Sequence, residues 1–328
     1  MRQQSRGRTP AARTLVVLGV CLAVLGGVGA WLLSARDTTR PCNGLAGDER
    51  VRKSLGAAVR PGMSCSAFGD VLVEATAGRE PGIHTRAQAQ ALKDVLVALD
   101  PEGTGTLRVD PALRRPLATA LVDYAPDLHA MLGGHGGDHI THAAPGIPPW
   151  ESDGTAHLAV LTRTLERELR AIAQDPRAYA LLRSAETRSA AGRLAAVPAD
   201  ATGYALTVPA TEGARALGVL DGVADLVTRS QQDDESRTWR TAVVDGLLDE
   251  PTMPGGSRNG QAAGLVSIWL RDLRATPEDR RPERLGTQAV DMTRTWTRTR
   301  KTDQAVQEDL LDRVRKSQDS GRREATSS

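Results

Sequence analysis

The sequence has few aromatic residues: Phe, Trp and Tyr make up 3% of its 328 residues, and there is a single Phe. The side-chain volume of a core must therefore come mainly from Leu, Val and Ala. A composition rich in Ala and Leu and poor in aromatic residues favours helices over sheets. No convincing run of alternating apolar and polar residues predicts a sheet. We therefore predict an all-α fold.

The short motifs of several large enzyme classes are also absent. The sequence contains no GxSxG elbow, no phosphate-binding P-loop and no GxGxxG that follows a predicted strand. No Ser or Thr stands three residues before a Lys, which excludes the SxxK arrangement of penicillin-binding enzymes. Because these chemistries are excluded, binding or structural support is the function reached by elimination.

The chain has no strong net charge. Its formal net charge is +2, from 42 Lys and Arg residues against 40 Asp and Glu residues. Four of the Arg residues (Arg2, Arg6, Arg8 and Arg13) precede every acidic residue. Without these four, 38 basic residues face 40 acidic ones, which leaves the rest of the chain at −2. A nearly neutral body lacks the electrostatic footprint of a nucleic-acid-binding protein, so we expect no nucleic-acid partner.

One long apolar run follows the basic N-terminus. Residues 15–33 (LVVLGVCLAVLGGVGAWLL) contain no charged side chain. As a helix they would be roughly 28 Å long, close to the hydrocarbon thickness of a bilayer. We predict a single-pass transmembrane anchor at 14–34, with the Arg-rich segment 1–13 in the cytoplasm, because positive charge is retained on that side. A polar stalk at 35–43 then leads to a domain outside the cell membrane.

A cleaved signal peptide is the alternative interpretation of this run. The small residues at 28–30 resemble a cleavage site. Trp31 and the two Leu after it prolong the apolar run beyond that site, which favours an uncleaved anchor. Within the span, Ala23 and Gly27 have the spacing of small residues at helix contacts in membranes, and this permits a homodimer through the span.

The sequence has three cysteines, and two of them follow the predicted anchor. Cys21 lies within the span, whereas Cys42 and Cys65 would lie outside the membrane. A pair of cysteines in an oxidising compartment predicts a disulfide. Two unpaired thiols would be expected instead if the topology were inverted.

The extracytoplasmic domain is expected to span residues 44–316 and to consist of many helices. After the histidine-rich loop, residues 153–173 form a long amphipathic run. The polar end of the chain, residues 317–328, is expected to be disordered. Later helices are expected at 211–229, 235–249, 258–274 and 284–316.

Local start signals mark three of the earlier helices. Thr85 precedes an amphipathic run, as an N-cap does. Asp110 and Asp175 are each followed by Pro, which is the preferred order of residues at a helix start. These signals predict helices that begin directly after each of the three residues.

A weak internal similarity links residues 104–112 with residues 202–210. Both segments carry a short β-prone stretch, at 106–109 and at 205–208, and the two stretches could pair as a small two-stranded ribbon. The domain would then be an imperfect duplication of about 44–132 and 153–250. Chance similarity within a biased composition is the alternative.

The stretch MLGGHGGDHITHAAPG, residues 131–146, is the main candidate for chemistry. Imidazole and carboxylate groups are zinc ligands when they converge, and the glycines would let the loop fold back on itself. Asp153 and His157 are further potential donors downstream. The predicted metal ligands are His135, Asp138, His139 and His142.

A solvent-exposed, glycine-rich connection is the alternative interpretation of this stretch. It lacks the Glu of the HExxH pattern, so no obvious general base lies beside the histidines. The leading functional expectation is therefore a membrane-anchored protein that binds a protein or cell-envelope partner, or supports the envelope structurally. The alternative is a metal-binding protein, or a metal-dependent hydrolase, that uses the histidine cluster with a transition metal such as zinc.

Overall fold

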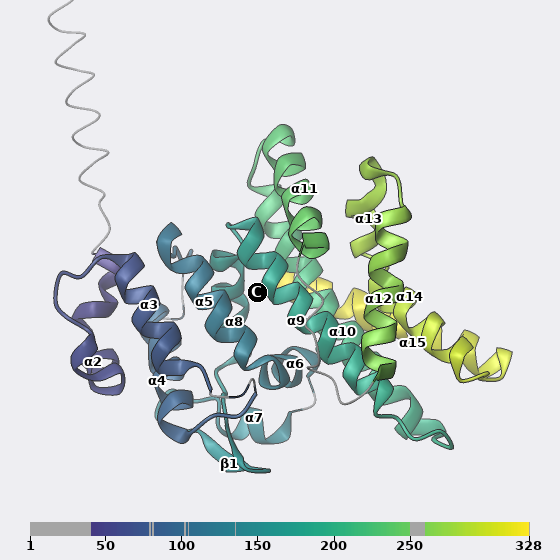
Figure 1. Cartoon of the computed structure of the whole chain (residues 1–328), viewed down its shortest axis with the longest axis horizontal. Coiled ribbons are helices and arrows are strands. Elements are labelled where there is room, and N and C mark those ends of the chain that lie inside the picture. Colours follow the sequence, from purple (N-terminus) through teal and green to yellow (C-terminus); the bar gives the residue numbers. More distant parts are fainter. Residues whose placement is uncertain are drawn as a thin grey trace, which may run out of the picture.

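The fold is mostly helical, with one small antiparallel sheet of two strands (Figure 1). The predicted predominance of helices is therefore confirmed, and the small ribbon that is present is formed by other residues than those predicted. The segment 1–13, the anchor 14–34 and all but the end of the stalk 35–43 lie outside the described residues. None of the described helices combines the length and the apolar character needed to cross a bilayer. The computed structural model describes residues 41–78, 80, 82–101, 103, 105–134, 136–249 and 260–327.

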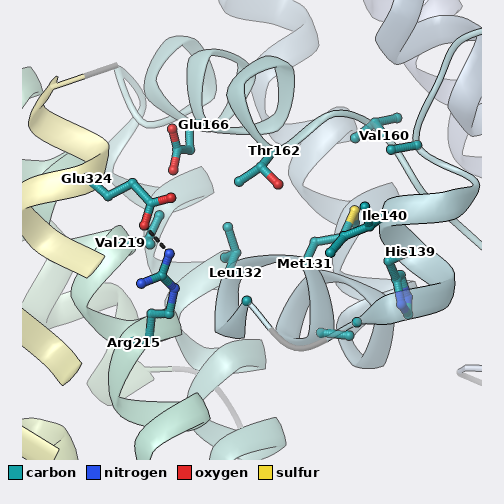
Figure 2. A pocket seen from close by; sticks show the side chains of 14 residues that line it. Met131, Leu132, His139, Ile140, Val160, Thr162, Glu166, Arg215, Val219 and Glu324 are labelled. Atoms are coloured by element: carbon teal, nitrogen blue, oxygen red, sulfur yellow. Dashed lines mark hydrogen bonds and ion pairs between the residues drawn. The ribbon is translucent and has the colours of Figure 1, made fainter. Parts of the chain in front are cut away.

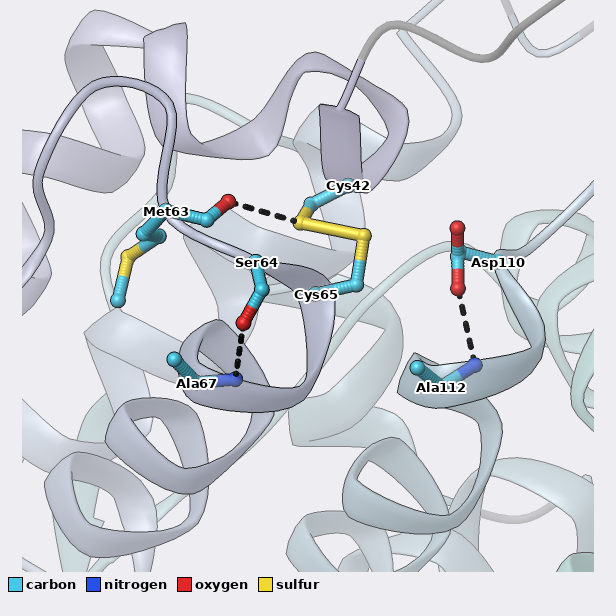
Figure 3. Close-up of a disulfide and its surroundings, with 7 residues drawn as sticks. All are labelled: Cys42, Met63, Ser64, Cys65, Ala67, Asp110 and Ala112. Atoms are coloured by element: carbon cyan, nitrogen blue, oxygen red, sulfur yellow. Dashed lines mark hydrogen bonds between the residues drawn. A yellow bond between two sulfur atoms is a disulfide. The ribbon is translucent and has the colours of Figure 1, made fainter.

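The first region begins at Pro41 and ends with α5. Two of the predicted helix starts are confirmed here: Thr85 forms a reciprocal capping box with Gln88, and Asp110 accepts a bond from the N–H of Ala112. The predicted disulfide joins Cys42 to Cys65, whose Cα atoms are 4.8 Å apart (Figure 3). The elements of this region are η1 (Pro41–Gly47), α2 (Glu49–Leu55), η2 (Gly56–Ala58), α3 (Cys65–Thr76), α4 (Arg86–Leu99) and α5 (Pro111–Asp123).

The second region contains the only named strands of the described chain. They form a hairpin in which Trp150 pairs with His157, and Asp153 and Gly154 make the turn with positive φ angles of 52° and 80°. The helix predicted to run through 153–173 therefore starts only at Thr162. Asp-Gly suits a two-residue turn because both residues tolerate positive φ. The elements are α6 (Ala125–Gly133), α7 (Gly137–Thr141), β1 (Trp150–Ser152), β2 (Thr155–His157) and α8 (Thr162–Ile172).

The third region is built around two long helices, α9 (Pro176–Ala195) and α10 (Gly203–Arg229). Asp175 caps α9 as predicted. Arg183 of α9 is fully buried, and its guanidinium donates to Asp221 of α10 at 2.6 Å and to Gln288 at 3.0 Å. A buried charge needs such partners, so this network fixes the neighbouring helices around α9. The later elements are α11 (Asp233–Asp249), α12 (Gly260–Ala275), η3 (Glu278–Arg280), α13 (Arg281–Leu285), α14 (Gln288–Thr299) and α15 (Gln304–Ser327).

Two predictions about the end of the chain are wrong. The single helix expected at 284–316 is divided into the end of α13, then α14, then α15, and Lys301 between the last two has a positive φ of 54°. The tail expected to be disordered is helical through Ser327. The tail is ordered because it packs along α10, where Arg322 forms a two-bond ion pair with Asp225 at 2.6 and 2.8 Å.

Glycines make the contact between α10 and α15 unusually close. A Cβ atom added at Gly222 would lie 2.6 Å from the carbonyl oxygen of Arg322. Additions at Gly218 and Gly321 would overlap backbone of the opposite helix in the same way. The two helices therefore pack backbone against backbone. The polar composition of residues 317–328 does not predict this contact.

The ribbon predicted between 106–109 and 205–208 is not formed. Residues 106–109 lie in a connection without regular secondary structure, and residues 205–208 belong to the first turns of α10. The helix prevails there because Leu206, Ala210 and Ala214 recur at helical spacing and are all buried. The two similar segments thus have different structures, and this removes the observation that suggested a duplication.

Candidate metal centre

Helix α6 places one carboxylate at the centre of the candidate site. Asp127 lies in the first turn of α6, where a negative charge is favoured by the helix dipole, and it is 4% exposed. Its Oδ2 accepts a bond from the backbone N–H of Leu158 at 2.9 Å. This bond orients the carboxylate and leaves Oδ1 directed at two histidines.

Two imidazoles from different elements meet at Oδ1 of Asp127. Nε2 of His139, on α7, lies 2.9 Å from this oxygen, and Nδ1 of His157, at the end of β2, lies 2.8 Å from it. The three candidate ligand atoms all lie within 4.8 Å of one another. Ligand atoms of tetrahedral zinc, at about 2.1 Å from the ion, are about 3.4 Å apart. The two N–O distances are about 0.5 Å shorter than this, so an ion would replace the two hydrogen bonds and move each imidazole nitrogen slightly away from Oδ1.

Of the three predicted ligands that the structure describes, only one belongs to this group. His139 is part of it, whereas His135 lies outside the described residues. The side chain of Asp138 is exposed, and Nδ1 of His142 is bonded to the backbone oxygen of Asp138 at 2.8 Å. The side chains of Asp138 and His142 therefore do not join the group of Asp127, His139 and His157. His157 was expected only as a further donor. Asp127 was not predicted at all.

Trp150 fixes the rings of the neighbouring histidines. Its indole stacks with the rings of both His142 and His157, with centroid distances of 4.6 and 4.9 Å and interplanar angles of 23° and 22°. His139 meets the same indole edge-on, at 4.8 Å and 89°. Offset stacking and edge contacts both stabilise such pairs. His142 thus supports the site through Trp150, although it supplies no ligand atom to the group.

The outer shell of the group suits a metal ligand set. Nε2 of His157 lies 2.9 Å from the hydroxyl oxygen of Ser152, on the opposite strand of the hairpin. A histidine that ligates through one nitrogen usually bonds a protein group through the other, which fixes its tautomer and ring orientation. Two imidazoles and one carboxylate suit zinc and other transition metals, and they leave at least one coordination position open.

Further bonds tie the loop and the hairpin to α4. Lys93 is fully buried, and its ammonium group donates to the carbonyl oxygens of His142 and Ile147. Burial lowers the pKa of Lys93 to about 8, although neighbouring Asp94 acts in the opposite direction. At the start of α4, the carbonyl of His84 accepts a bond from the N–H of Ala156 at 2.9 Å. Strand β2, which carries His157, is therefore bonded to β1 along one edge and to the backbone of His84 along the other.

A cavity of about 200 Å³ lies beside His139 (Figure 2). His139 stands at one end of it, and the ion pair between Arg215 and Glu324 stands at the other. Met131 and Leu132 are among the apolar side chains between these ends. The cavity gives a small molecule room next to one of the candidate ligands.

No protein family, curated protein or solved structure matches this chain.

Proposed function

We propose that this chain is a single-pass membrane protein whose extracytoplasmic helical domain binds a transition metal ion, zinc in the first place, through Asp127, His139 and His157. The observation that carries the proposal is the convergence of one carboxylate oxygen and two imidazole nitrogens from three separate elements. The buried carboxylate, the stacked Trp150 and the bond between His157 and Ser152 support it, because metal ligands need such orientation.

The proposed location outside the membrane is supported by the apolar run at 15–33 and the four preceding arginines. The cysteine pair at 42 and 65 agrees with it, since disulfides persist in oxidising compartments. In this setting the domain would act on or bind a protein or cell-envelope partner. Metal-dependent hydrolysis is the second candidate, favoured by the open coordination position and the adjacent cavity.

The test is metal analysis of the full chain, purified in detergent without a polyhistidine tag. After dialysis, zinc, iron, copper, nickel, manganese and calcium are measured by elemental analysis. We expect about one equivalent of a transition metal per chain, as a three-ligand site binds one ion. His157→Ala should abolish the bound metal.

The matched control is Asp138→Ala, which removes a carboxylate that was predicted from the sequence but lies outside the group. This variant should keep its metal. Metal content at background level in the wild-type chain would contradict the proposal, and equal metal content in His157→Ala would place the ion elsewhere. A hydrolase would further show hydrolysis of ester or phosphodiester substrates that is lost on chelation.

A further inference from the structure

The first elements of the domain carry an exposed group of basic residues. Residues 50–60 contain four basic residues and no acidic one. All four are exposed, and none of them forms an ion pair with a residue that the structure describes. The basic patch, as we call this group, consists of Arg50, Arg52, Lys53 and Arg60.

Helix α2 turns three of these cations away from the core. Val51 and Leu55 are buried and define the inner side of the helix, because residues four positions apart share a face. The three cations of α2 occupy the rest of the circumference. Asp48 is the N-cap and accepts a bond from the N–H of Val51 at 3.1 Å, so its charge is engaged within the helix. Glu49 is then the acidic side chain of α2 that opposes the three cations.

The basic patch lies close to the point where the predicted anchor joins the domain. The chain from residue 34, where the anchor ends, to Pro41 can extend over at most about 25 Å. The disulfide between Cys42 and Cys65 closes a loop that contains the whole basic patch and ties it to this entry point (Figure 3). Helix α2 also lies at one end of the long axis of the molecule, whereas α14 lies towards the other end (Figure 1).

We propose that the basic patch rests on anionic lipid headgroups of the bilayer that holds the anchor. This inference depends on the membrane anchor of the proposed function and is independent of the metal. Each Lys or Arg close to an anionic bilayer strengthens the attachment about fivefold. The short connection favours the bilayer over an acidic protein as the partner, because it keeps headgroups at a high effective concentration beside the patch.

The test is the acetylation rate of single lysines in the full chain, measured by mass spectrometry. The chain is reconstituted into nanodiscs of phosphatidylcholine, with or without phosphatidylglycerol, and treated with an N-hydroxysuccinimide ester of acetate. Lys53 belongs to the basic patch, and Lys301, exposed between α14 and α15, is the internal control. We expect Lys53 to react at least about fivefold more slowly in the anionic nanodiscs, while Lys301 reacts equally fast in both. High salt should abolish the difference at Lys53, since it screens exposed charges.

The triple variant Arg50→Gln/Arg52→Gln/Arg60→Gln removes most of the patch and keeps the lysine that reports on it. Its Lys53 should react at nearly the same rate in both kinds of nanodisc, because a single cation is held only weakly by the headgroups. Circular dichroism should show an unchanged helix content, since the three substituted residues are exposed.

The matched control is Arg229→Gln/Arg298→Gln/Arg323→Gln, which removes three exposed cations from α10, α14 and α15. It should retain the slow reaction of Lys53 in anionic nanodiscs. Equal rates at Lys53 in both lipids for the wild type, or a lipid dependence that survives in the patch variant, would overturn this inference and leave the anchor in place. A chain that does not enter neutral nanodiscs has no anchor, and both the proposed location and this inference would then be wrong.

Discussion

The contact between α10 and α15 and the candidate metal centre join distant segments by opposite means. In the first, glycines such as Gly218 and Gly321 let two backbones approach until no Cβ fits between them. In the second, long polar side chains cross the space between α6, α7 and β2 and meet at the carboxylate of Asp127. The helix contact is therefore sensitive to atoms that are added, and the metal centre to atoms that are removed.

The largest effect is expected from one methyl group added to the helix contact. In Gly218→Ala the new Cβ overlaps the backbone carbonyl of Gln318, which cannot turn away as the end of a flexible side chain can. We expect the free energy of unfolding, measured by urea denaturation, to fall by more than about 3 kcal/mol. Gly264→Ala, at a helical position with open space, should be neutral or stabilising. Equal stability of Gly218→Ala and the wild type would show that the helices do not approach so closely.

A pH-dependent effect is expected in the region of the metal centre, from Lys93. Its pKa of about 8 in the folded state lies below the ordinary value of 10.5, so the unfolded chain binds more protons between these values and stability rises with pH there. From about pH 8 to about pH 9.5 the gain amounts to about 1.5 kcal/mol. The neutral amine still has two N–H groups for its two carbonyl partners.

Lys93→Met is the variant that isolates this contribution. Urea denaturation at several pH values should show a flatter rise of stability for the variant than for the wild type. Lys53→Met, at an exposed position of α2, should follow the wild-type curve. Parallel curves for Lys93→Met and the wild type would mean that Lys93 titrates as an exposed lysine does.

The smallest effect on stability and the most complete effect on binding are expected from Asp127→Asn. The amide keeps one acceptor oxygen, so we expect a loss of only about 1 kcal/mol in the free energy of unfolding. The negative charge between the two imidazoles disappears, so bound metal should fall to background in elemental analysis. A variant that retains its metal would remove Asp127 from the ligand set, and a loss of several kcal/mol would show that its main role is structural.

Local signals in the sequence predicted the parts of the fold that depend on local chemistry. The helices that start after Thr85, Asp110 and Asp175 are present because each cap side chain bonds to nearby backbone N–H groups of its own helix. The Asp153-Gly154 pair is also a local signal, because it is typical of a two-residue hairpin turn. The sequence analysis nevertheless included it in the helical run at 153–173, because the residues after it are amphipathic.

The candidate site was predictable only in part, because its centre depends on tertiary structure. His139 was identified from the histidine-rich stretch, whereas Asp127 precedes it by 12 positions and lies on a different helix. His157 reaches the group because the hairpin reverses the chain at Gly154. The ordered tail was missed for a similar reason: its buried residues gain partners only from segments far away in the sequence, as when Gln318 donates to Asp221 of α10 and to the carbonyl oxygen of Gly286.

The closeness of α10 and α15 has a consequence for how the protein is made. Arg322 and its partner Asp225 are 97 positions apart, so α10 leaves the ribosome long before the helix that covers its glycine-lined side. Throughout that interval, the side of α10 that contains Gly218 and Gly222 is not covered by α15. Chains arrested before residue 318 should therefore be cleaved readily by protease near α10, and resistance should arise only once the residues up to 325 have emerged.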